Sequence, residues 1–228
     1  MIMNDQILVV IPAYNEEKRI SPVVNGAKAF LPVLVVDDGS SDGTAVIAEG
    51  AGAQVVRQIP NQGKGEALRT GFSYALEGNY QAVITIDADG QHDPIEIPKF
   101  LHSYEESAAN LIIGRRDFSQ MPPIRRLANS LGQWSFSWAL RQNIPDNQSG
   151  YRLIDRIMMA AMLSSREGGF EFEVDMIVTC IIQDMKLAWV PIQTIYRDET
   201  SHINAFHHTV NFARMIWETR QLVNQEEK

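Results

Sequence analysis

The fold class is decided by one stretch of the sequence, Ala82-Val83-Ile84-Thr85-Ile86-Asp87-Ala88-Asp89-Gly90-Gln91. Its first five residues are apolar or β-branched and predict a buried strand at 82–86. The strand ends in two carboxylates one residue apart, where an α/β sheet opens its ligand crevice. Burying such a pair is costly unless a cation neutralises it, and hard divalent metals prefer oxygen ligands. The pattern favours a Mg²⁺ or Mn²⁺ site that also holds phosphate oxygens, although an acidic pair at a strand end is by itself more often structural.

Three further segments strengthen this interpretation. The apolar run 8–12 stops at Pro12 before polar residues, and the run 33–36 ends in Asp37 and Asp38, with a helix predicted to begin near Thr44. Segment 61–67 combines glycines, which allow close backbone approach, with Lys64, which can meet a phosphate. Because acids follow parallel strands, the sequence predicts a nucleotide pocket on an α/β fold whose mostly parallel sheet is covered on both faces.

The order of these motifs resembles that of family 2 glycosyltransferases of the GT-A fold. The motifs are V-I-P-A-Y-N-E, V-D-D-G-S-S-D-G-T, N-Q-G-K-G-E-A, D-A-D-G-Q and G-R-R. Within that family the chain is most similar to polyprenyl-phosphate sugar transferases of the dolichyl-phosphate mannosyltransferase type. The resemblance runs from about residue 7 to about residue 204 and includes segments 149–153 and 190–197. It implies inverting transfer of a sugar from a GDP- or UDP-linked donor to a polyprenyl phosphate, with Mg²⁺ or Mn²⁺ as cofactor.

The resemblance also implies roles for individual residues. The metal ligands would be Asp87, Asp89 and Gln91. The predicted donor-binding residues include Lys64, whose cation can meet a phosphate. The full set is Pro12, Tyr14, Glu16, Asp38, Lys64, Asp87, Ala88, Arg197 and His202. His202 follows Ser201 where relatives often have a lysine, which makes this contact to the diphosphate pH-dependent or absent. The predicted catalytic residues are Asp89, Arg115, Arg126 and Arg197.

Arginines concentrate between residues 114 and 156. Seven arginines against three aspartates give this segment a charge of +4, so the rest of a chain with net charge −8 carries −12. The excess favours a specific anionic ligand, and the alternative is a solvated face with compensating neighbours. By resemblance Arg115 and Arg126 contact the acceptor phosphate. Because each belongs to an Arg-Arg pair, the neighbouring arginine is the alternative at each position. The predicted acceptor-binding residues are Arg115, Arg125, Arg126 and Ser130.

Apolar spacing predicts a helix from about residue 124, with an apolar stripe that includes Trp134 and Trp138 and docks on the sheet. The positions of Arg125, Arg126 and Ser130 near its start suit phosphate binding. A second helix is predicted over about 204–223. Core packing, a homodimer contact and membrane-interface contact remain open for it.

The acceptor class depends on whether a base is needed. A lipid phosphate is already anionic, whereas a sugar hydroxyl needs a carboxylate to take its proton, and the candidates are Glu171, Glu173 and Asp175. Segment 171–175 is predicted to be a loop entering a helix. The arginines favour the phosphate, with a hydroxyl acceptor as the alternative. Two other classes of protein fit less well. A sugar nucleotidyltransferase should have a glycine-rich loop after its first strand, which this chain lacks. A catalytically silent nucleotide-binding partner would have lost the acids or arginines that this chain keeps.

Length and composition agree with one domain over residues 1–228. We divide it into a nucleotide-sugar half (4–115), an acceptor half (116–203) and a C-terminal helix (204–228). The net charge argues against nucleic acid and against general attraction to anionic membranes. Cys180 is the only cysteine and is predicted to be an inert core thiol. With no readable signal peptide or membrane span, we expect a cytoplasmic protein that reaches its acceptor peripherally at the membrane face or through a membrane partner.

Overall fold

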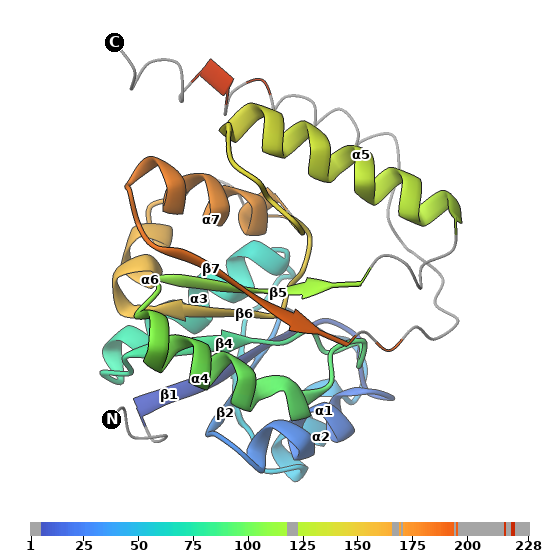
Figure 1. Cartoon of the computed structure of the whole chain (residues 1–228). Coiled ribbons are helices and arrows are strands. Elements are labelled where there is room, and N and C mark those ends of the chain that lie inside the picture. The colour runs from blue at the N-terminus through green and yellow to red at the C-terminus, as the bar shows by residue number, and fades with distance from the viewer. Residues whose placement is uncertain are drawn as a thin grey trace.

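The computed structural model describes residues 6–117, 123–165, 169, 171–193, 195, 217, 220 and 221. Its centre is a seven-stranded sheet with the strand order β3-β2-β1-β4-β6-β5-β7 (Figure 1). The strands are β1 (Ile7–Ala13), β2 (Val33–Asp37), β3 (Gln54–Arg57), β4 (Ala82–Thr85), β5 (Leu111–Arg116), β6 (Arg152–Asp155) and β7 (Leu187–Ile192).

The sheet is mostly parallel, as predicted. β1 pairs in parallel with β2 and β4, β2 with β3, and β5 with β7. β6 runs antiparallel to both of its neighbours, β4 and β5. The carboxyl ends of β1, β2, β4, β5 and β7 therefore meet at the same edge of the sheet as the amino end of β6. This edge is where the α/β architecture is expected to bind ligands.

Helices cover both faces of the sheet (Figure 1). One face packs against α1 (Ile20–Lys28), α2 (Thr44–Gly50) and α4 (Ile97–Ser107), which follows the 3-10 helix η2 (Pro94–Glu96). The other face packs against α3 (Lys64–Glu77), α6 (Arg156–Met162), α7 (Glu171–Ile182) and the end of α5 (Pro123–Leu140). β1 is apolar and buried along its whole length, as expected of a strand covered on both faces.

The packing of α3 on β1 positions one side of the predicted nucleotide pocket. Leu8 and Val10 of β1 face α3, whereas Ile7, Val9 and Ile11 face α1. A Cβ on Gly71 would lie 2.4 Å from Cγ1 of Val10, so only a glycine allows α3 to approach the strand this closely. The start of α3, at Lys64, is thereby fixed relative to the ends of β1 and β4.

Several predicted boundaries change in the structure. The helix predicted near Thr44 does begin at that residue, but α7 already begins at Glu171, so the predicted loop over 171–175 is wrong. The stripe on α5 is also corrected: Trp134 and Trp138 are 68% and 54% exposed, while Phe136 is buried in the core. A helix of 18 residues can present more than one apolar face. The face of α5 that packs in the core includes Phe136 and Leu140, and Ile144, just after the helix, joins them.

Cys180 is buried, and burial raises the pKa of its thiol to about 12, in agreement with an inert core cysteine. Within the described residues, no helix is both long enough and apolar enough to span a membrane. Two predicted donor-binding residues, Arg197 and His202, lie outside the described residues. So does the predicted C-terminal helix, of which only Trp217, Arg220 and Gln221 are described. The side chains of Arg125 and Arg126 do as well.

Candidate active site

The strand ends bring the predicted donor-binding segments together. The backbone N–H of Asp38 donates to the carbonyl of Ala13 at 2.8 Å, and that of Ile86 donates to Val10 at 3.2 Å. The ends of β1, β2 and β4 therefore lie side by side. Pro12 is buried among them and Tyr14 is 50% exposed. The structure thus places the Pro12–Tyr14 segment, Asp38 and the Asp87–Asp89 turn at one edge.

The turn after β4 holds its acids in a defined arrangement. Gly90 has a φ of 76°, a conformation that favours glycine. The backbone N–H of Gln91 donates to Oδ1 of Asp89 at 2.9 Å, and its side-chain amide donates to Oδ2 at 2.9 Å. Within the described residues no three His, Cys, Asp or Glu side chains gather as a metal-binding group. A cation here would need oxygens from a ligand as well, which is how Mg²⁺ is usually held beside substrate phosphates.

Asp87 is paired with a lysine from another element. Nζ of Lys64 lies 2.6 Å from Oδ1 of Asp87 and 3.0 Å from Oε1 of Glu173, and the side chain of Lys64 is 18% exposed. Burial alone would lower the pKa of Lys64, but the two carboxylates raise it above its ordinary value. Burial would raise the pKa of Asp87, whereas Lys64 and then His92 hold it below its ordinary value. Lys64 therefore lies between two acids from opposite halves of the chain.

Gly150 forms the wall behind these two carboxylates. Because β6 is antiparallel, its amino end reaches the same edge as Asp87, and the carbonyl of Gly150 accepts a hydrogen bond from Oγ1 of Thr85 at 2.7 Å. A Cβ on Gly150 would lie 2.6 Å from Oδ2 of Asp87 and 2.9 Å from Oε1 of Glu173. Sequence reasoning gave Gly150 no role, although it lies in the Ser149–Leu153 motif that supports the family resemblance.

His92 packs behind Asp87 and is buried. Its Nδ1 lies 3.7 Å from Oδ2 of Asp87, and the imidazole ring lies 5.3 Å from the ring of Tyr151. Burial lowers the pKa of His92 to about 4, so the imidazole is neutral near pH 7. The histidine therefore contributes packing and a dipole to the site, and its position was not apparent from sequence spacing.

Asp38 holds the loop that leads into α3. Its carboxylate accepts hydrogen bonds from the backbone N–H groups of Gln62 and Gly63, both at 2.8 Å, and from the side chain of Gln58 at 2.6 Å. These bonds fix the residues just before Lys64. The predicted contact of Asp38 with the base or ribose stays a prediction.

Three arginines of segment 114–156 are bound to other groups of the protein. Arg116 binds Asp146 through two nitrogens, at 2.7 and 2.9 Å, and Asp146 is fully buried. Arg152 is also fully buried and donates to backbone carbonyls, including that of Ser149 at 2.8 Å. Arg156 donates to the carbonyls of Leu76 and Tyr80 near the end of α3. The charge excess counted along the sequence is therefore only partly available to a ligand.

Arg115 is placed differently from Arg116. Its side chain is exposed at the carboxyl end of β5, and Ser130 on α5 is exposed as well. Of the two neighbouring arginines, Arg116 is committed to Asp146, so Arg115 is the one presented to solvent at the ligand-binding edge. This arrangement supports the register in which Arg115 meets an acceptor.

After β7 the chain returns to the acidic turn at residues 87–91. The backbone N–H of Ile195 donates to the carbonyl of Gln91 at 2.9 Å. Ile195 therefore lies beside the acidic turn, and Arg197, two residues further on, lies outside the described residues.

Comparison with known proteins agrees with the geometry of the site. A family model described as glycosyl transferase family 2 matches residues 8–165. The chain belongs to this family. It is 30% identical over 213 residues to the polyprenol monophosphomannose synthase of Mycolicibacterium smegmatis, covering 84% of this chain and 78% of the relative. It is 28% identical over 218 residues to a UDP-N-acetylglucosamine–dolichyl-phosphate N-acetylglucosaminyltransferase of Methanococcus voltae, covering 84% and 86%.

Solved structures show the same fold. Glucosyl-3-phosphoglycerate synthase from Mycobacterium tuberculosis, solved with Mn²⁺, uridine diphosphate and glucosyl-3-phosphoglycerate, matches with a TM-score of 0.72 and 21% identity. The match covers 93% of this chain and 77% of that protein. The GT-A fold predicted from the motifs is confirmed.

Proposed function

We propose that this glycosyltransferase moves a sugar, with inversion, from a UDP- or GDP-linked donor to a polyprenyl phosphate. The observation that carries the proposal is the pairing of an acidic turn with an exposed arginine at one sheet edge. Asp89 in the turn after β4 suits a metal-bound diphosphate, and Arg115 at the end of β5 suits a second anion. Relatives named for polyprenyl and dolichyl phosphate support the same acceptor class.

On the donor side, Asp87, Asp89 and Gln91 would hold a divalent cation. As a Lewis acid, Mg²⁺ or Mn²⁺ would take up the charge that grows on the departing diphosphate. The M. tuberculosis structure with Mn²⁺ and uridine diphosphate supports this assignment by fold. Ala88, in the same turn, is a further proposed donor contact. The remaining proposed donor contacts are Pro12, Tyr14, Glu16, Asp38, Arg197 and His202.

On the acceptor side, the state of Glu173 favours a phosphate nucleophile. Glu173 was a candidate base for a hydroxyl acceptor, but it is buried and held 3.0 Å from Lys64. Asp175, another candidate, accepts a hydrogen bond from Ser165 at 2.6 Å. A phosphate oxygen needs no base, only cations that hold it in line with the sugar carbon. We assign this work to Arg115, with Arg125, Arg126 and Ser130 of α5.

The two neighbouring arginines of β5 give a paired test of the acceptor site. Arg115→Ala should raise the KM for a short-chain polyprenyl phosphate by tenfold or more, because it removes a charge-assisted contact, while the melting temperature stays unchanged. Arg116→Ala should instead lower the free energy of unfolding by about 3 kcal/mol, because it leaves Asp146 buried without its partner. Steady-state kinetics and denaturant unfolding measure both. Equal acceptor KM values in Arg115→Ala and the parent protein would exclude Arg115 from the acceptor site.

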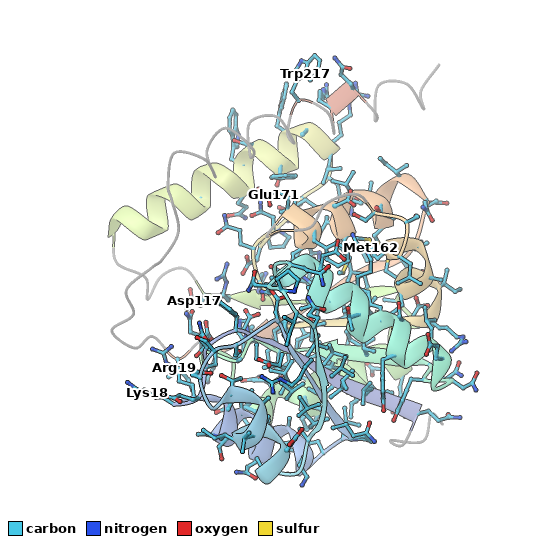
Figure 2. The ribbon with its side chains drawn as sticks, turned by 180° about the vertical axis from the view of Figure 1, so that it is seen from behind. Lys18, Arg19, Asp117, Met162, Glu171 and Trp217 are labelled. Atoms are coloured by element: carbon cyan, nitrogen blue, oxygen red, sulfur yellow. The ribbon has the colours of Figure 1, made fainter. Side chains whose placement is uncertain are left out.

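We also propose that α5 lies against the membrane that carries the acceptor. Trp134 and Trp138 are exposed at neighbouring positions of this helix, and Trp217 is 62% exposed. Figure 2 shows Trp217 at the end of the molecule along which α5 runs, and the guanidinium of Arg220 lies 4.9 Å from the ring of Trp138. Tryptophan rings favour the interfacial layer of a bilayer, and a patch of this kind explains their exposure.

Vesicle binding tests this placement. The double substitution Trp134→Ala/Trp138→Ala should weaken co-sedimentation with vesicles that contain polyprenyl phosphate by at least tenfold, because it removes apolar area from the interface. Turnover with a water-soluble short-chain acceptor should change little. Val46→Ala, which trims an exposed apolar residue on α2, is the matched control. Unchanged vesicle binding in the tryptophan variant would contradict the proposal.

A further inference from the structure

A partly buried ion cluster joins the two halves of the molecule. Lys64 is the first residue of α3, Asp87 follows β4, and Glu173 lies in the first turn of α7. The side chains of Lys64 and Glu173 are 18% and 6% exposed, and that of Asp87 is 24% exposed. Segments more than 80 residues apart in the sequence thus meet through one ammonium group.

The backbone places Lys64 at this point independently of the ion pairs. Gly63 has a φ of 94°, and its N–H donates to Asp38, so the chain enters α3 in a single orientation. The close approach of Gly71 to Val10 fixes the axis of α3 on the sheet. The lysine is therefore delivered to the two carboxylates by elements that are themselves fixed.

The cluster carries two negative charges and one positive charge. Gly150 lies against both carboxylates, since one added Cβ would contact Asp87 and Glu173 together, at 2.6 and 2.9 Å. Two ionised carboxylates this close repel each other unless a cation lies between them. The two carboxylates therefore hold the ammonium of Lys64 at a fixed point, and removing one partner from such an ion pair is destabilising.

We infer that Lys64 is a positioning residue that holds the Asp87 carboxylate in place for the donor site, with Glu173 as its second anchor. Lys64 then acts on the donor through Asp87, and the direct phosphate contact predicted from the sequence is the competing role. The inference builds on the proposed donor chemistry and does not depend on the acceptor.

Metal and nucleotide binding separate the two roles of Lys64. Lys64→Met removes the cation that lies within 3.0 Å of both Asp87 and Glu173, so the affinity for Mn²⁺ alone, measured by electron paramagnetic resonance, should rise by at least tenfold. Adding Glu173→Gln removes the excess charge, so the double variant should return to within about threefold of the parent protein. Binding of UDP or GDP at saturating Mn²⁺, measured calorimetrically, should change in the opposite direction. Lys64→Met should lose at least tenfold in nucleotide affinity, and the double variant should largely recover it.

Lys28→Met is the matched control, because Lys28 is an exposed lysine whose Nζ contacts the carbonyl of Ala51 away from the site. Should Lys64→Met fail to fold, the double variant, which has one carboxylate fewer and the net charge of the parent cluster, still carries the test against Glu173→Gln alone. The inference is overturned if the double variant binds nucleotide as weakly as Lys64→Met. Where Lys64→Met does not fold, it is overturned if the double variant binds nucleotide at least tenfold more weakly than Glu173→Gln. Lys64 would then contact the diphosphate itself. None of these measurements uses an acceptor, so failure of the polyprenyl phosphate assignment would leave them unaffected.

Discussion

Asp89→Asn is expected to lower glycosyl transfer by about a thousandfold, equivalent to about 4 kcal/mol of transition-state stabilisation. The substitution keeps the size of the side chain but removes the charge of a proposed metal ligand. Asp89 accepts two hydrogen bonds from Gln91 and is half-buried, so the fold should be retained. Initial rates at saturating donor and Mn²⁺ give the comparison.

The matched control is Asp184→Asn. Asp184 is exposed and has a φ of 51°, a conformation that asparagine tolerates as well as aspartate. This variant should keep full activity and full sensitivity to a chelator. Turnover by Asp89→Asn within tenfold of the parent rate, or full parent activity in excess chelator, would remove the metal assignment.

Gly150→Ala is expected to lower turnover by about a hundredfold, with a loss of only about 1–2 kcal/mol in the free energy of unfolding. The new methyl group would lie under 3.0 Å from oxygens of both Asp87 and Glu173. Those oxygens are ends of side chains and can move, so the fold should tolerate the change while the Asp87 carboxylate, which we propose as a metal ligand, is displaced. Activity should therefore fall far more than stability, which kinetics and denaturant unfolding measure separately.

Gly50→Ala is the natural comparison for that variant. Gly50 ends α2, and a Cβ there would meet nothing within 4 Å, so the substitution should leave turnover unchanged. Parent-like turnover in Gly150→Ala would show that the two carboxylates need not stay where the structure places them.

The strand ends were predictable because their chemistry is local. An apolar run followed by acids, as at 33–38 and 82–89, identifies both a buried strand and the edge where its polar residues emerge. Motif order then identified the family and the GT-A fold. The helix start at Thr44 was readable for the same reason, since a glycine-rich turn precedes it.

The interior of the site depends on contacts that no local pattern encodes. Lys64, Asp87 and Glu173 come from three elements, and only the antiparallel insertion of β6 places Gly150 among them. Counting charge along the sequence could not distinguish Arg115, which is exposed, from Arg116, which is bound to buried Asp146. Helical spacing likewise allowed more than one packed face on α5, and tertiary contacts selected the one that leaves Trp134 exposed.

The most direct test compares a short-chain polyprenyl phosphate with the corresponding polyprenol as acceptors, each with UDP- and GDP-linked sugars and Mn²⁺ or Mg²⁺. The account predicts a sugar phosphopolyprenol from at least one donor, no transfer to the alcohol, and only a small loss of rate in Glu173→Gln, because no hydroxyl proton has to be removed. Transfer to a hydroxyl acceptor that Glu173→Gln or Asp175→Asn abolishes, with no product from the phosphate, would contradict it.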